Sequence, residues 1–215
     1  MIRSEGPPVG TPDTKYAAVP TGAALERAAA SLRSHGLEVI VAETGDEARR
    51  EALSRIPADS EVFDATSRTL EEIGLTKALA ELPGVSLLRP KLARLDRKTQ
   101  ASEIRRITQT PGVVIGSVHA VTEDGQVLVA SATGSQLGPY AAGAGKVIWI
   151  VGWQKVVPTL ADGLARLERY ALPLEDARAR QAYGVGSSLN RILIVRREHQ
   201  PGRTTLILVK QQLGF

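Results

Sequence analysis

A carboxylate stands at the tip of a turn between two apolar runs. Residues 119–132 read HAVTEDGQVLVASA, so Glu123-Asp124-Gly125 separates two strand-like segments. Asp-Gly between apolar runs predicts a β-hairpin, and turn chemistry alone accounts for the tripeptide. In open α/β folds, ligands bind beyond the carboxyl ends of strands. A glutamate there could act as a nucleophile, a general base or a hydrogen-bond acceptor, which makes Glu123 the candidate catalytic residue.

A glycine-rich loop follows the second run. It reads SATGSQLG over residues 131–138, with further glycines at 143 and 145. Successive N–H groups in such a loop can surround an anion, and the hydroxyls of Thr133 and Ser135 beside Gly134 would add donors. The loop lacks the Lys-Ser/Thr ending of a P-loop and the glycine spacing of a dinucleotide fingerprint. It is therefore either a cradle for phosphate or carboxylate or an ordinary connection.

Two basic residues stand near predicted strand ends. His119 precedes Glu123 by four residues, so both side chains would share one face of a continuous strand and could exchange protons. The alternative for His119 is a hydrogen-bonded structural role. Lys155 follows the apolar run KVIWIV, and it either binds an anion or is a surface lysine beside a turn.

The stretch from residue 89 to residue 106 is rich in Lys and Arg. It could contact phosphates, but aromatic residues are missing from it and no nucleic-acid-binding motif accompanies it. A solvated helix face explains such a run, so no nucleic-acid partner is expected.

Helices and strands alternate along most of the chain. Helices are expected over residues 23–34, 46–55 and 158–170, in the second half of 89–106, and after a Thr69-x-x-Glu72 capping box. Strands are expected over residues 37–42, 61–65, 85–88, 113–122, 126–132, 146–151, 191–195 and 204–209, with a turn at 199–202 joining the last two. This order predicts one α/β domain with a mixed sheet.

Composition narrows the chemistry further. The chain of 215 residues has no cysteine and only three histidines, far apart, which argues against disulfides, iron–sulfur clusters and histidine-based metal sites. No cofactor or metal is therefore expected. The net charge of +4 suits either a soluble surface or an affinity for anionic ligands.

The N-terminal segment is rich in Pro, Gly and Thr. Residues 1–22 are predicted to form a flexible or wrapping arm, with the domain proper over residues 23–215. No signal peptide or membrane-length apolar run is present, so a cytoplasmic location without membrane contact is expected.

Several segments resemble the LUD-domain family, that of lactate-utilisation protein C. Residues 66–75, TSRTLEEIGL, are similar to its Ser-x-Thr-Leu-x-x-Ile-Gly segment, and HAVTEDGQVLV is similar to its Asn-Ala-Ile-Thr-Glu-Asp-Gly-x-Leu-Val. GKVIWIVGWQKVV and the ending RILIVRREHQPGRTTLILVKQQLGF resemble its Lys-Val-Ile segment and its closing hairpin. The resemblance covers the chain from about residue 60 to its end.

This resemblance implies a three-layer α/β/α fold with a mostly parallel sheet, akin to sugar-phosphate isomerases and CoA transferases. It also implies a link to lactate oxidation beside iron–sulfur oxidoreductase partners. His119 and Gln154 depart from the family's frequent asparagines. Residues 183–191, YGVGSSLNR, lack the cysteines that some relatives carry, which leaves a redox role for that stretch in doubt.

The prediction from these observations is a protein that binds a small anionic ligand in support of lactate or organic-acid utilisation. The expected cleft is lined by the Thr-Glu-Asp-Gly turn and the glycine-rich loop. Two alternatives are an acyl or CoA transferase with a glutamate nucleophile and a non-catalytic assembly component for iron–sulfur partners; a homo-oligomer is compatible with each. The expected site residues are Glu123 as the catalytic group and, as ligand-binding groups, Ser67, Thr69, His119, Thr133, Gly134, Ser135 and Lys155.

Overall fold

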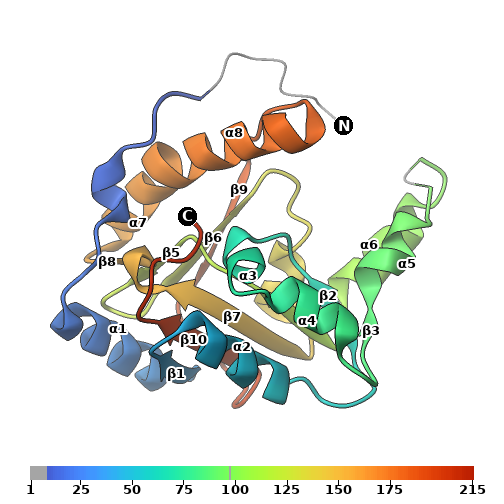
Figure 1. Cartoon of the computed structure of the whole chain (residues 1–215), viewed down its shortest axis with the longest axis horizontal. Coiled ribbons are helices and arrows are strands. Elements are labelled where there is room, and N and C mark those ends of the chain that lie inside the picture. The colour runs from blue at the N-terminus through green and yellow to red at the C-terminus, as the bar shows by residue number, and fades with distance from the viewer. Residues whose placement is uncertain (1–8, 97) are drawn as a thin grey trace.

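The computed structural model describes residues 9–96 and 98–215. Residues 1–8 of the predicted arm therefore lie outside the described residues. Within the described part, the chain forms two sheets surrounded by helices (Figure 1). The predicted α/β class is confirmed.

The larger sheet has six strands, all parallel to their neighbours. Its central strands are buried on both faces, which explains their continuous apolar sequences. The strand order is β1 (Glu38–Ala42), β10 (Thr204–Val209), β7 (Lys146–Gly152), β4 (Val113–Gly116), β2 (Glu61–Asp64) and β3 (Ser86–Leu87).

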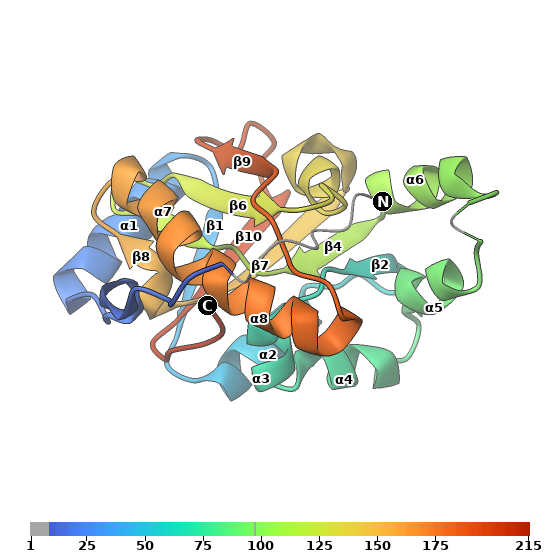
Figure 2. The same cartoon turned by 90° about the horizontal axis from the view of Figure 1, so that it is seen from above.

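Alternate residues of these strands enter two different cores. Ile148 and Ile150 of β7 join the core beneath α2 (Gly45–Ser54), α3 (Arg68–Glu72) and α4 (Leu75–Glu81). Val147, Trp149 and Val151 join the opposite core, which includes residues of α1 (Gly22–Ser34), α5 (Leu88–Ala93), α6 (Ala101–Gln109) and the second sheet. Figure 2 shows α2, α3 and α4 on one side of the large sheet, with β6 and β9 on the other.

The smaller sheet has the order β8 (Val156–Val157), β5 (Ala120–Thr122), β6 (Val127–Ser131) and β9 (Arg191–Val195). Its β5–β6 hairpin confirms the predicted turn at residues 123–125, and β6 and β9 are also antiparallel. The outer face packs on α7 (Leu160–Arg166), which continues through a π-helical segment, Leu167–Ala171, into α8 (Leu172–Tyr183).

Two predicted strand arrangements are wrong. The stretch 113–122 is broken into β4 and β5, because the chain leaves the large sheet after Gly116 and enters the small one at Ala120. The last two strands do not form a hairpin: β9 pairs with β6, and β10 lies between β1 and β7. All residues of β10 are buried, whereas β9 keeps an exposed face, so only β10 suits the centre of a covered sheet.

Two predicted helix starts are also shifted. Thr159, rather than Pro158, caps α7, since its hydroxyl accepts the N–H of Asp162 at 3.2 Å. The capping box at Thr69 is wrong because Ser67 caps α3, accepting the N–H of Leu70 at 3.4 Å. The side chain of Thr69 is thereby left for other contacts.

Candidate functional site

The carboxyl ends of three neighbouring strands meet at a buried lysine. Thr69 follows β2, Ser117 follows β4, and Lys155 lies in the 3-10 turn Trp153–Lys155 after β7. The Lys155 Nζ donates to the hydroxyl of Thr69 at 2.9 Å and to that of Ser117 at 3.0 Å. Only 2% of Lys155 is exposed. This edge of a parallel sheet is where ligands bind in open α/β folds.

The environment of Lys155 disfavours its charge. Burial lowers its pKa well below the usual lysine value, the positive charge of Arg166 lowers it further, and Glu72 acts in the opposite direction. Within the described part of the chain, no carboxylate lies within ion-pair distance of Lys155. The amine is therefore held mainly by hydroxyl groups.

Arg166, the last residue of α7, is fully buried beside this lysine. Its Nε donates to the carbonyl oxygen of Tyr16 at 3.1 Å, and its Nη1 donates to the carbonyl oxygen of His119. Its Nη2 finds no hydrogen-bond partner among the described residues. Burial lowers the pKa of Arg166 to about 10, so the guanidinium stays charged at neutral pH with one donor unsatisfied.

His119 completes this group. Its Nδ1 accepts the N–H of Ala130 at 3.1 Å, which places the ring proton on Nε2. Burial, with smaller effects from the charges of Lys155 and Arg166, lowers its pKa to about 3. His119 is therefore neutral at physiological pH. We refer to His119, Lys155 and Arg166 as the basic cluster.

Two terminal segments cover the basic cluster. The 3-10 turn Thr14–Ala17 provides the carbonyl oxygen of Tyr16 to Arg166 and lies against the turn that holds Lys155. The C-terminal tail provides the carbonyl oxygen of Leu213, which accepts from Thr69 at 3.2 Å and from Gln154 at 2.9 Å. The segments meet where the Gln212 side chain donates to the carbonyl oxygen of Ala17 at 2.9 Å.

Glycine is required at one position of the tail. Gly214 has a φ of +59°, and its N–H donates to Glu72 at 2.7 Å. A Cβ at this position would lie 2.5 Å from the hydroxyl oxygen of Thr69. The tail therefore crosses the cluster in close backbone contact with α3.

Glu123 lies apart from this cluster. Its Oε2 accepts from the Nε of Arg27 in α1 at 2.7 Å, and both side chains are partly exposed. Its N–H donates to the carbonyl oxygen of Val157 at 3.0 Å. The predicted proton exchange between His119 and Glu123 has no geometric support, since each group is bonded to a different partner.

The glycine-rich loop lies at the opposite end of β6 from Glu123. At roughly 3.3 Å per residue, the five residues of the strand separate the two by about 16 Å. The N–H of Gly134 donates to Ser131 Oγ at 2.8 Å, and that of Ser135 donates to Thr133 Oγ1 at 3.4 Å. The loop thus satisfies its own donors, and the structure does not bring it into one cleft with Glu123.

The predicted binding residues therefore separate into two groups. Thr69, His119 and Lys155 come together; Ser67 is occupied as the cap of α3, and Thr133, Gly134 and Ser135 remain at their own loop. Sequence reasoning missed Ser117 and Arg166. A signal for Arg166 was available, because it follows Gly163 by three residues on the helix face that packs against the sheet.

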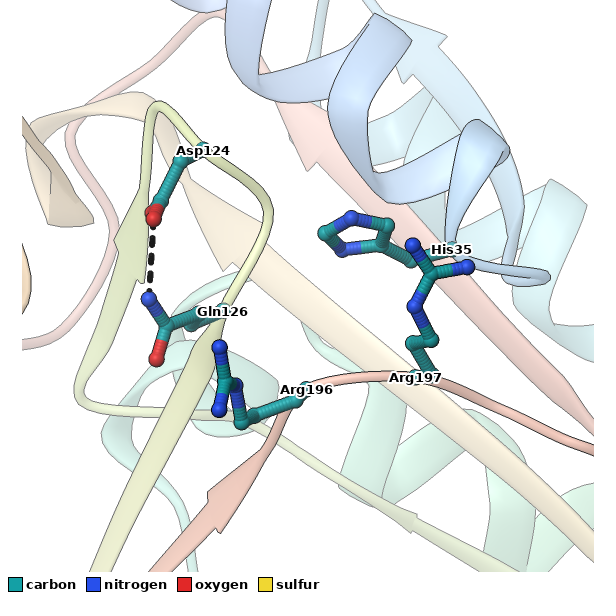
Figure 3. A pocket seen from close by; sticks show the side chains of 5 residues that line it. All are labelled: His35, Asp124, Gln126, Arg196 and Arg197. Carbon is teal, nitrogen blue, oxygen red and sulfur yellow. Dashed lines mark hydrogen bonds between the residues drawn. The ribbon is translucent and has the colours of Figure 1, made fainter.

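A cavity of about 360 Å³ lies beside the Glu-Asp-Gly turn. Its lining residues are His35, Asp124, Gln126, Arg196 and Arg197 (Figure 3). Asp124 accepts from the hydroxyl of Thr122 and, at 2.9 Å, from the amide of Gln126. These hydrogen bonds, that from Thr122 first, lower the pKa of Asp124. The turn therefore directs Asp124 toward the cavity, whereas Glu123 binds α1.

No group of three or more His, Asp or Glu side chains suited to a metal ion occurs among residues 9–96 and 98–215. In the same residues, no helix is long and apolar enough to cross a membrane.

Comparison with known proteins gives a family and a related fold. The family model described as LUD domain matches residues 25–209. A crystal structure of a DUF162 family protein from Deinococcus radiodurans aligns with a TM-score of 0.55 and 13% identity, covering 88% of this chain and 99% of that one. Ribose 5 phosphate isomerase A from Neisseria gonorrhoeae aligns with a TM-score of 0.34 and 16% identity over 55% of this chain and 57% of its own, which is too weak to support an argument. No curated protein matches the sequence significantly.

Proposed function

Since this chain belongs to the LUD domain family, we propose that it supports the utilisation of lactate or a related organic acid by binding the acid's carboxylate at the basic cluster. The proposal keeps the predicted class of ligand and moves its site. The proposed binding site lies at the carboxyl ends of β2, β4 and β7. It does not lie between the Glu-Asp-Gly turn and the glycine-rich loop, as the sequence predicted.

One observation carries this proposal: a fully buried guanidinium has an unpartnered donor and no carboxylate counter-ion among the described residues. The ring of Tyr170 lies 5.0 Å from the guanidinium carbon and offers a cation–π contact but no acceptor atom for Nη2. A buried charge without a counter-ion is costly, and a buried polar group without a hydrogen bond costs about 1–3 kcal/mol. A carboxylate would supply both the missing charge and the missing acceptor. Guanidinium groups bind carboxylates with two parallel hydrogen bonds, and Nη2 of Arg166 would form such a pair together with Nε once the carbonyl oxygen of Tyr16 is displaced.

Lys155 makes the affinity for the carboxylate depend on pH. Its pKa is lowered in the empty protein, and a nearby carboxylate favours the charged form. At a pH above the lowered pKa, binding therefore draws a proton onto Lys155, and affinity falls as pH rises between that pKa and the ordinary lysine value. The hydroxyls of Thr69 and Ser117 remain available to orient the lysine in either state.

Entry requires the terminal segments to open. The turn Thr14–Ala17 and the tail from Gln211 onward are attached over the cluster by a small set of hydrogen bonds. Segments held in this way open at lower free energy than the sheet beneath them. The ligand would then take acceptor positions that the carbonyl oxygens of Tyr16 and Leu213 now occupy.

Acyl or CoA transfer with Glu123 as nucleophile has weaker support. The carboxylate of Glu123 is paired with Arg27, and the loop expected to donate to an oxyanion lies at the far end of β6. A role as an assembly component for iron–sulfur oxidoreductases stays a prediction that rests on the resemblance alone.

Thermal unfolding and calorimetry with lactate, pyruvate, acetate and inorganic phosphate test the proposal. Ligand at 100 times its Kd stabilises a protein by about 2.7 kcal/mol, so carboxylates should raise the Tm of the parent protein. Arg166→Met and Lys155→Met should lose this shift. Arg27→Met is a matched control with the same loss of charge at the surface, and it should keep the shift.

Two further readouts sharpen the test. Calorimetry in buffers of different ionisation enthalpy should show proton uptake on carboxylate binding by the parent and none by Lys155→Met. Equal carboxylate shifts in the parent and in a folded Arg166→Met variant would refute the proposal.

A further inference from the structure

The strand β9 is an edge of the smaller sheet. It pairs with β6 on one side and with no strand among the described residues on the other. Backbone groups of Gln126, Leu128 and Ala130 point toward β5, since they bond Thr122 and His119. The intervening residues of β6 therefore bond β9, through partners Arg191, Leu193 and Val195. The N–H and C=O groups of Ile192 and Ile194 face the open edge.

The side chains of this edge strand divide between the core and the surface. Leu193 and Val195 pack against the larger core. Ile192 and Ile194 remain 40% and 38% exposed, among the most exposed large apolar side chains of the described chain. An open edge with outward isoleucines is a template for the addition of another strand.

Positive charges flank this edge at both ends. Arg191 precedes the isoleucines, and Arg196 and Arg197 follow them, the last two lining the cavity in Figure 3. Neither Arg196 nor Arg197 forms an ion pair in the part of the chain that the structure describes. A second β9 added antiparallel would bring Arg191 of each copy near Arg196 and Arg197 of the other, which is repulsive.

We propose that the open edge of β9 binds an extended segment of a different protein, with apolar residues over Ile192 and Ile194 and acidic residues at its ends. Main-chain hydrogen bonds to residues 192 and 194 supply affinity, and the arginines supply specificity. The acidic residues at one end of the segment pair with Arg196 and Arg197, which follow β9. This interaction is independent of the basic cluster and of its ligand.

A labelled, terminally blocked hexapeptide of sequence Asp-Val-Thr-Val-Asp-Glu is the probe, and the same peptide with lysines in place of the acids is its control. Fluorescence anisotropy should show binding of the acidic peptide that weakens with salt, and little binding of the lysine peptide. Amide hydrogen exchange at Ile192 and Ile194 should slow several-fold on binding.

Two variants separate edge pairing from other modes. Ile194→Pro removes an outward N–H together with the isoleucine side chain, a change that edge strands tolerate, and should abolish binding while leaving the Tm nearly unchanged. The double variant Arg196→Glu, Arg197→Glu should reverse the preference between the two peptides. Equal binding of both peptides to the parent, binding undiminished in both variants, or concentration-dependent self-association through β9 would overturn the proposal.

Discussion

Two arginines are buried among the residues that the structure describes, and their surroundings differ. Arg203 precedes β10, and its side chain donates to the carboxylate of Glu198 at 2.9 Å, to the carbonyl oxygen of Ala144 at 3.0 Å and to that of Pro139 at 2.9 Å. Arg166 has two carbonyl acceptors, no carboxylate and an unpartnered Nη2. Both arginine side chains are almost completely buried. Every guanidinium nitrogen of Arg203 has a hydrogen-bond acceptor, whereas Nη2 of Arg166 has none among the described residues.

This difference separates a structural role from a binding role. Arg203 ties the start of β10 to the π-helical segment Pro139–Gly143, and its partners all belong to the chain. Arg166 carries a charge that the described chain does not neutralise, at an edge where parallel sheets bind ligands. The most informative buried charge is therefore the one whose hydrogen bonds are incomplete.

The largest expected effect is on Arg203. Arg203→Met leaves the mostly buried Glu198 and several carbonyl oxygens without their donor. Breaking a buried pair by removing one partner costs about 3–5 kcal/mol, so urea unfolding should show a loss of that size. A loss below about 1 kcal/mol would show that Arg203 is no more structural than Arg166.

Arg166→Met should behave differently in the absence of ligand. It removes a buried charge that has no counter-ion, and this relief offsets the loss of the hydrogen bonds to the carbonyl oxygens of Tyr16 and His119. The free energy of unfolding should stay within about 1 kcal/mol of the parent value or rise. Destabilisation as large as that of Arg203→Met would show that Arg166, like Arg203, has a structural role.

Lys155→Met should change how stability depends on pH. The folded pKa of Lys155 is lowered, so between that value and the ordinary lysine pKa the unfolded chain binds a proton that the folded protein does not. The stability of the parent should then rise with pH across this window, by at most about 1.4 kcal/mol per pH unit for one proton. Chemical unfolding from pH 7 to pH 10 should show this contribution in the parent and its loss in Lys155→Met; identical profiles would contradict the lowered pKa.

The smallest effect is expected at Glu123. Its ion pair with Arg27 is partly exposed, and such pairs contribute about 0–1 kcal/mol. Glu123→Gln should therefore change the unfolding free energy by less than about 1 kcal/mol and leave carboxylate binding unaltered. A loss of carboxylate binding in this variant would show that the ligand binds at the Glu-Asp-Gly turn and not at the basic cluster.

Local signals in the sequence were sufficient for much of the fold. VIWIV in β7 and LILV in β10 are uninterrupted apolar runs, which fits their place in a covered parallel sheet, and Asp124-Gly125 correctly marks the β5–β6 hairpin. The pairing of β9 and β10 could not be read from a turn between them. It depends on burial of both faces of β10, and that is a property of the whole sheet.

The candidate site was only partly accessible to the same reasoning. Lys155 was identified because it follows a buried strand, but the strand ends that bring Thr69 and Ser117 to it depend on the order β7-β4-β2. The hydroxyl and glycine residues of the glycine-rich loop are the residue types found in anion-binding loops, so the sequence predicted an anion site there. Short side chains in loops also satisfy their own backbone, and here they do.

The position of β10 also bears on how the chain is made. Its six residues lie between β1 and β7, yet they are synthesised some 160 residues after β1. Until they are synthesised, β1 and β7 have no strand between them, and the backbone groups on those edges lack their sheet partners. Such a late central strand favours slow folding and a need for chaperones during translation, since the core closes only when strands that are far apart in the sequence pair.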